Sequence, residues 1–149
     1  MTIIRGTKQR MTTVFHGDRA LGVTPVAVSD TKALEGLAAG ALVAVRGVTK
    51  GKGFAGVVKR HGFHGGPKTH GQKNRHRAPG SIGNTTPQRV IPGRRMAGRM
   101  GGVNRTIKNL TVVGINVEKG IVTLKGAVPG NTKGEVRITL TSHEPKLRN

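Results

Sequence analysis

The sequence predicts an all-β fold, a small sandwich or barrel, interrupted by a long, irregular and strongly basic segment. Two observations lead to this prediction. Short β-branched and apolar runs separated by turn residues occupy both ends of the 149-residue chain. Between them, residues 47–108 mix Gly, Pro, Lys, Arg and His and show no sustained helical or strand period. We therefore expect residues 1–46 and 109–149 to form one discontinuous β domain, and residues 47–108 to form an extension of it.

The N-terminal part contains four short candidate strands, at residues 3–4, 11–15, 23–28 and 42–45. Residues 16–19 (HGDR) have the composition of a hairpin turn between the second and third of these strands. Residues 32–39 predict one helical turn or a loop. Residues 54–58 (FAGVV) either continue a strand or begin a helix.

The C-terminal part contains three stronger candidate strands. Residues 110–117 (LTVVGINV) and 121–128 (IVTLKGAV) are joined by a short loop ending in Gly120, which favours a hairpin. Residues 129–131 (PGN) indicate a turn. The apolar residues at 136, 138 and 140 then alternate with polar ones, which predicts a half-buried strand. The two ends together provide six or seven short strands.

The charge of the chain is one-sided. The formal net charge is +20, and no Asp or Glu lies between Glu35 and Glu118, an interval that contains 15 Lys and Arg residues. Like charges repel within a compact state, so a polyanion such as a nucleic acid is the natural partner. Hydrophobic residues make up 34% of the chain, with three Phe and no Tyr or Trp. We therefore expect a small core and a large segment that packs on something else.

Seventeen residues of the basic segment are candidates for contacts with RNA. Arg can form paired hydrogen bonds with phosphate, His and Phe can stack on bases, and Lys supplies a mobile point charge. For Phe54 and Phe63, anchoring the base of the segment is an equally good interpretation. The candidates are Lys50, Lys52, Phe54, Lys59, Arg60, His61, Phe63, His70, Lys73, Arg75, His76, Arg77, Arg89, Arg94, Arg95, Arg99 and Arg105.

Metal, nucleotide and acid–base chemistry are poorly supported. Four histidines of the basic segment have no Cys or carboxylate among them, and the surrounding positive charge repels a dication, so we predict no metal site. Residues 47–53 (GVTKGKG) differ from a phosphate-binding loop in their spacing and in the residue after the second Lys. The six acidic residues are scattered. We expect no catalytic residues, no cofactor and no small-molecule substrate. The histidines are His61, His64, His70 and His76.

Membrane insertion is also not expected, because no apolar run approaches the roughly 18 residues of a membrane-spanning helix. The chain contains no Cys. This composition fits a reducing compartment.

Five motifs follow one another along the chain: residues 47–60 (GVTKGKGFAGVVKR), 69–71 (THG), 76–83 (HRAPGSIG), 96–101 (MAGRMG) and 124–130 (LKGAVPG). Together with residues 6–8 (GTK), 11–12 (MT) and Phe15 near the start, they resemble the universal large-ribosomal-subunit protein three family, of the bacterial or organellar type. The motifs are long and specific, and the resemblance covers nearly the whole chain.

This resemblance implies a β-barrel body of the type shared with translation factors and a basic extension that threads into large-subunit ribosomal RNA. It implies a structural constituent of the large ribosomal subunit that binds this RNA early in assembly and lies beside neighbouring ribosomal proteins. The location implied is a cytoplasmic or an organellar ribosome. The tip of the extension, directed towards the peptidyl transferase centre, would correspond to Ile82, Gly83, Asn84, Thr85, Thr86 and Pro87.

The sequence departs from the family in two places: the tip is one residue shorter than in common bacterial forms, and one connection of the β body is shortened. Residues 29–42 form a brief connection where family members usually have a much longer stretch, so we expect a reduced barrel. The alternative to the ribosomal interpretation is a nucleoid-type DNA-binding basic protein. Such a protein would not need a β body with a long extension, and no helix with groove-reading side chains is evident.

Overall fold

The computed structural model describes residues 3–141 and divides the chain into two compact units. The body unit comprises Met1–Lys50 and Gly102–Asn149, and the basic unit comprises Gly51–Gly101. Within the described residues, helix is limited to the 3-10 helix η1 (Thr31–Leu34) and the α-helix α1 (Val57–His61). No helix in this part of the chain has the length and apolarity needed to cross a membrane.

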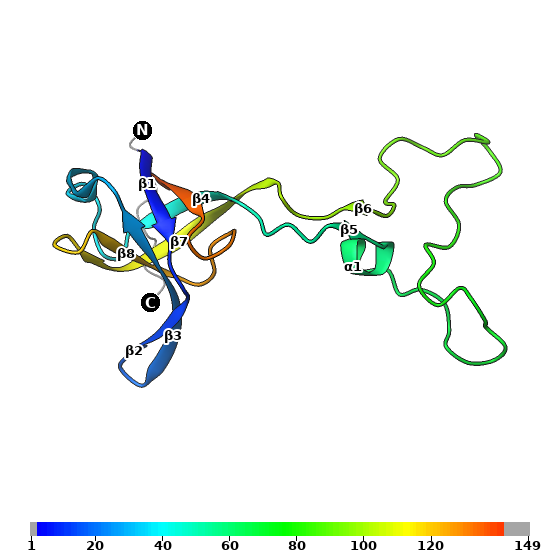
Figure 1. Ribbon diagram of the computed structural model, residues 1–149, viewed down its shortest axis with the longest axis horizontal. Helices are drawn as coiled ribbons and strands as arrows, with labels where there is room; N and C mark the ends of the chain where they lie inside the picture. Colours follow the sequence, from blue (N-terminus) through cyan, green and yellow to red (C-terminus); the bar gives the residue numbers. More distant parts are fainter. Residues whose placement is uncertain (1–2, 142–149) are drawn as a thin grey trace, which may run out of the picture. The chain divides into compact units, whose positions relative to one another are not determined.

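An antiparallel sheet of seven strands builds the body unit (Figure 1), in the order β1-β9-β4-β7-β8-β3-β2. Strand β1 pairs with β9 along one edge and also with β3 along the other, so the sheet nearly closes into a ring. The all-β prediction is confirmed at this level. The strands are β1 (Ile3–Lys8), β2 (Thr12–His16), β3 (Arg19–Val28), β4 (Leu42–Val48), β7 (Asn104–Asn116), β8 (Ile121–Lys125) and β9 (Glu135–Leu140).

The core of the body unit consists of the inward-facing side chains of these strands. Ile4 and Val45 are each the Cα partner of Ile138, and all three are at most 1% exposed. The brief connection between β3 and β4 adds to this core, because Leu34 and Leu37 are buried in the same cluster. This connection therefore also covers part of the ring's interior.

Several strand boundaries differ from the predicted ones. Strand β7 begins at Asn104, earlier than expected, because β4 continues to Val48 and its last residues pair with the start of β7. Strand β8 ends at Lys125, earlier than expected, because Gly126 has a φ of 91° and turns the chain. The hairpin turn predicted at residues 16–19 is confirmed, since β2 ends at His16 and β3 begins at Arg19.

The basic unit contains little regular structure. Strand β5 (Phe54–Ala55) pairs with β6 (Gly98–Arg99), and α1 follows β5 directly. Both interpretations of residues 54–58 were therefore partly right, because a strand ends and a helix begins within them. Ala55 and Val57 are buried here, and the rest of the unit consists mostly of loops.

We predict that Ile138→Ala destabilises the chain by about 2–5 kcal/mol, because it leaves a cavity between β1, β9 and β4. Chemical denaturation followed by circular dichroism measures this loss. Ile3→Ala is the matched control, since Ile3 lies on β1 and is 58% exposed. Its expected effect is within about 0.5 kcal/mol. Equal losses in the two variants would mean that the inside and outside of the ring have been wrongly assigned.

Candidate nucleic-acid interface

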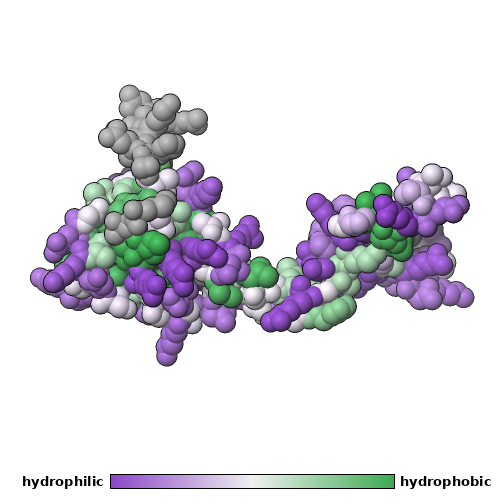
Figure 2. Space-filling view, turned by 90° about the horizontal axis from the view of Figure 1, so that it is seen from above, coloured by the Kyte–Doolittle hydropathy of each residue, from purple (hydrophilic) through white to green (hydrophobic). Residues whose placement is uncertain are grey.

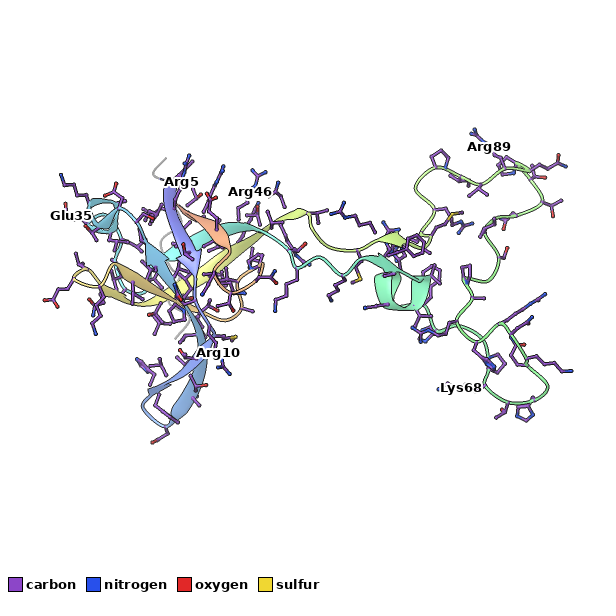
Figure 3. The ribbon with its side chains drawn as sticks, viewed as in Figure 1. Arg5, Arg10, Glu35, Arg46, Lys68 and Arg89 are labelled. Carbon is purple, nitrogen blue, oxygen red and sulfur yellow. The ribbon has the colours of Figure 1, made fainter. Side chains whose placement is uncertain are left out.

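The structure places two of the predicted RNA-binding residues, Lys50 and Arg105, in the body unit and the other 15 in the basic unit. Most of these side chains are exposed, and hydrophilic side chains cover much of the visible surface of each unit (Figure 2). On two loops of the basic unit, Lys68 and Arg89 extend into solvent (Figure 3). Four candidates are only partly exposed: Arg60, His61, Phe63 and His76.

The exposed cations of the basic unit have no acidic partners. Across residues 3–141, the ion pair present is the one between Arg137 Nε and Glu135 Oε1, at 3.8 Å, and it lies in the body unit. No Asp or Glu occurs in the basic unit at all. Its exposed Lys and Arg side chains are therefore available to phosphate groups, and they repel one another until something neutralises them.

Arg60 and His61 are used to hold the basic unit together. Arg60 Nη1 donates to the backbone carbonyl of Met96 at 2.6 Å, and His61 Nε2 lies 3.0 Å from the same oxygen. These contacts fix the end of α1 to the segment that carries Arg94 and Arg95. Sequence reasoning missed the role of Met96, because a backbone carbonyl acceptor has no signature in the sequence.

A second set of contacts closes a basic loop at residues 66–76. The backbone N–H of Gly66 donates to the carbonyl oxygen of His76 at 3.1 Å, and His76 Nδ1 lies 3.0 Å from the carbonyl oxygen of Pro67. His76 thus shapes the loop from its base. The exposed basic and imidazole side chains that the closed loop carries are Lys68, His70, Lys73 and Arg75.

An open groove of about 590 Å³ lies beside this loop, with His61, Phe63, Gln72, Arg75 and Arg95 among its lining residues. The rings of His61 and Phe63 are tilted at 44°, with centroids 5.9 Å apart. An aromatic surface next to two guanidinium groups suits an unpaired nucleotide, with the base on the ring and the phosphate on Arg. Phe63 is therefore part of a groove wall.

The remaining candidate residues differ in how much their side chains contact the rest of the basic unit. Phe54 is 80% exposed, so its side chain contributes little to packing within the basic unit. Residues 82–87, the predicted tip, form an irregular and largely exposed loop. Just before it, Ser81 Oγ donates to the carbonyl oxygen of Gly83 at 2.8 Å. In the part of the chain that the structure describes, no three His, Asp or Glu residues are grouped so as to hold a metal ion.

In the body unit, Lys8 braces the turn that follows β8. Its Nζ donates to the carbonyl oxygens of Val128 and Gly130, at 2.7 and 2.9 Å. Burial lowers the pKa of Lys8, and the positive charge of Lys50 lowers this pKa further. Thr49, next to Lys50 in the sequence, is hydrogen-bonded to the distant Val103, with Thr49 N donating to Val103 O at 2.9 Å. The chain thus leaves and re-enters the body unit through two segments bonded to each other.

Comparison with known proteins gives a consistent result. A family model described as Ribosomal protein L3 matches residues 21–120. The chain is 53% identical over 113 residues to the large ribosomal subunit protein uL3 of Chlorobaculum parvum, which covers 75% of this chain and 54% of the relative. It is 57% identical over 100 residues to uL3 of Thermobifida fusca, with coverages of 66% and 46%.

A similar match, 54% identical over 100 residues, is found with the large ribosomal subunit protein uL3m of Schizosaccharomyces pombe, covering 66% of this chain and 39% of the relative. The chain spans about half the length of the curated relatives it matches.

We predict that Gly65→Ala opens the basic loop, because Gly65 has a φ of 77° and an added Cβ would collide with the carbonyl oxygen of His76. Limited trypsin digestion, with loop peptides quantified by mass spectrometry, should show faster cleavage after Lys68 and Lys73. Gly71→Ala is the control, since Gly71 has a φ of 78° but no atom within 4 Å of an added Cβ. It imposes the same left-handed strain, about 1–2 kcal/mol, without the collision. Indistinguishable cleavage rates in the two variants would contradict the proposed closure.

Proposed function

The chain belongs to the ribosomal protein L3 family, and we propose that it is a structural, non-enzymatic constituent of the large ribosomal subunit that binds ribosomal RNA. The observation that carries this proposal is the basic unit. Its Lys and Arg side chains are largely exposed and it contains no carboxylate, and Ala55 and Val57 are the side chains it buries. A segment with so little apolar burial gains its stability from a partner.

The proposed mechanism is neutralisation of phosphate charge. Lys and Arg of the basic unit replace counterions condensed on ribosomal RNA, so binding releases these ions to solution. Affinity then falls with salt, with a log–log slope of about 0.7–0.9 for each phosphate neutralised. The groove with Phe63, Arg75 and Arg95 adds a place for an unpaired base, which phosphate contacts alone do not provide.

In this proposal, the body unit is a reduced barrel of the translation-factor type, and residues 47–108 are the extension that penetrates the RNA. The loop at 82–87 is its tip, directed towards the peptidyl transferase centre. Neighbouring large-subunit ribosomal proteins are the further partners. Because relatives include bacterial uL3 proteins and a uL3m, the ribosome concerned is either bacterial or organellar.

Sedimentation tests the proposal directly. Extract of cells that make the chain is fractionated on a sucrose gradient in moderate and then in high salt. Co-migration with large subunits after the high-salt wash is the expected result, because an extension threaded through RNA cannot leave by ion exchange alone. Release into the top fractions, or co-purification with DNA, would instead indicate a surface-bound or nucleoid protein.

We predict that replacing Arg94 and Arg95 together by Ala reduces incorporation into large subunits while the β body stays folded. In binding to purified large-subunit RNA, the log–log salt slope should fall by roughly 1.4–1.8, since two phosphate contacts are lost. Arg10→Ala with Lys119→Ala is the control, because it removes two exposed charges from the body unit. Normal incorporation of the Arg94/Arg95 variant would show that this segment is dispensable for docking.

We predict a different outcome at the proposed tip. Replacing Asn84, Thr85 and Thr86 by Ala should leave assembly intact and change the sensitivity of translation to inhibitors of peptidyl transfer. In vitro translation with purified ribosomes, titrated with such an inhibitor, measures the shift. Asn131→Ala with Thr132→Ala, on an exposed turn of the body unit, should cause none. An unchanged inhibition curve for the tip variant would argue against the assigned tip position.

A further inference from the structure

Three arginines lie side by side on the outer surface of the body unit. Arg5 on β1 and Arg46 on β4 are each the Cα partner of Arg137 on β9. Side chains directly opposite each other in antiparallel strands have Cβ atoms roughly 4.5–5.5 Å apart. Arg5, Arg137 and Arg46 therefore form a continuous line across three strands, which we call the arginine row. Figure 3 shows Arg5 and Arg46 on the same side of the body, away from Arg10.

The orientation of this row follows from the core. Each arginine has a buried apolar residue as its neighbour in sequence. These neighbours are Ile4, Ile138 and Val45, which form the matching inward row and are at most 1% exposed. Because side chains alternate across a strand, the positions next to a buried row face outward. All three arginines are exposed. A slip of one residue would bury them, so the packing of the ring fixes the row where it is.

The row works against the stability of the free body unit. Like charges directly opposite on neighbouring strands are destabilising. The carboxylate of Glu135 partly offsets this repulsion, but its contact with Arg137 is 3.8 Å long and joins side chains that are 65% and 53% exposed. An exposed pair of this kind contributes little. The fold therefore places an excess of positive charge here that its own residues do not neutralise.

A hollow of about 150 Å³ lies next to the row. Its lining residues include Arg46, Asn104, Glu135 and Arg137. The two guanidinium groups and the Asn104 amide provide hydrogen-bond donors at its rim. The Glu135 carboxylate disfavours a small free anion enclosed in this hollow. A polymer backbone, in contrast, brings successive phosphates across the whole row, including Arg5 and Arg46, which lie on strands either side of β9.

We propose that the arginine row binds the phosphate backbone of a double-stranded RNA segment, at a site separate from the contacts of the basic unit. The strand spacing of about 4.8 Å makes the row roughly 10 Å long, a line of guanidinium groups suited to paired hydrogen bonds with phosphate. Thr106, the other Cα partner of Arg46, adds a hydroxyl beside the row.

The composition around the row selects duplex over unpaired RNA. Its exposed apolar neighbours are aliphatic, Ile3 on β1 and Val48 on β4, and no aromatic residue occurs on β1, β4 or β9. Unpaired bases are bound chiefly by stacking on aromatic rings, whereas a duplex exposes its backbone and hides its bases. The row thus differs from the groove at Phe63, which has an aromatic wall. The inference rests on the proposed function, since it requires the chain to work on RNA.

Arginine-selective modification of the whole chain tests the site. The protein is treated with phenylglyoxal alone, with a short blunt-ended RNA duplex, and with single-stranded RNA of the same length. Mass spectrometry then measures the reactivity of each arginine. We expect the duplex to protect Arg5, Arg46 and Arg137 and to leave Arg10 and Arg19, exposed elsewhere on the body unit, reactive.

A variant set provides the second readout. Arg5→Gln, Arg46→Gln and Arg137→Gln combined should lower the log–log salt slope for duplex binding by about 2–3, since up to three phosphate contacts are lost. Its matched control, Arg10→Gln, Arg19→Gln and Lys125→Gln combined, should leave the slope nearly unchanged. The row variant should melt at the same temperature as the parent chain or higher at low salt, because repulsion is removed. Such a melting curve shows that it is folded.

The outcomes separate this inference from the proposed function. Protection of Arg94 and Arg95 with an unprotected row would overturn the inference and leave the proposed function intact. Equal protection of the row by single-stranded RNA would also overturn it, because the site would then not select a duplex. Absence of protection at every arginine, with no RNA binding, would refute the proposed function and the inference with it.

Discussion

The double pairing of β1 is the constraint on which the rest of the body unit depends. By bonding to β9 on one side and to β3 on the other, β1 brings the start of the chain against its last described strand and nearly closes the sheet. This closure gives a chain with three Phe and no Trp or Tyr an interior that small aliphatic side chains can fill. The same pairing that buries Ile4 against Ile138 places Arg5 against Arg137 on the outside.

The two units achieve order by different physical means. The body unit buries a cluster of aliphatic side chains, as most small domains do. The basic unit lacks such a cluster and is held by a few polar contacts to backbone carbonyls, those of Met96 and Pro67 in particular. Side chains that could reach a phosphate, such as Arg60 and His76, are partly used for this purpose. The remaining cations stay exposed, which suits a surface whose partner completes the packing.

Most of the strands could be predicted because their patterns are local. The alternation around Ile138 and the turn residues between His16 and Arg19 need no knowledge of distant partners. The full length of β7 could not be predicted in the same way, because residues such as Arg105 have no strand pattern and are ordered by pairing with β4. For most of the candidate RNA-binding residues, the exposure of the side chain could be predicted from its charge. The contacts of Arg60, His61 and His76 with backbone carbonyl groups could not be predicted, because a carbonyl acceptor has no signature in a sequence.

The sequence by itself determined the charge of this protein, the absence of carboxylates from its basic interval, its β character and the motifs that indicate its family. These are properties of composition and of neighbouring residues, and they are present in any conformation of the chain. Tertiary structure alone decided which distant residues became neighbours. The alignment of Arg5, Arg137 and Arg46 is of this kind, because strand register depends on packing across the whole ring and cannot be read from the three short segments that contribute to it.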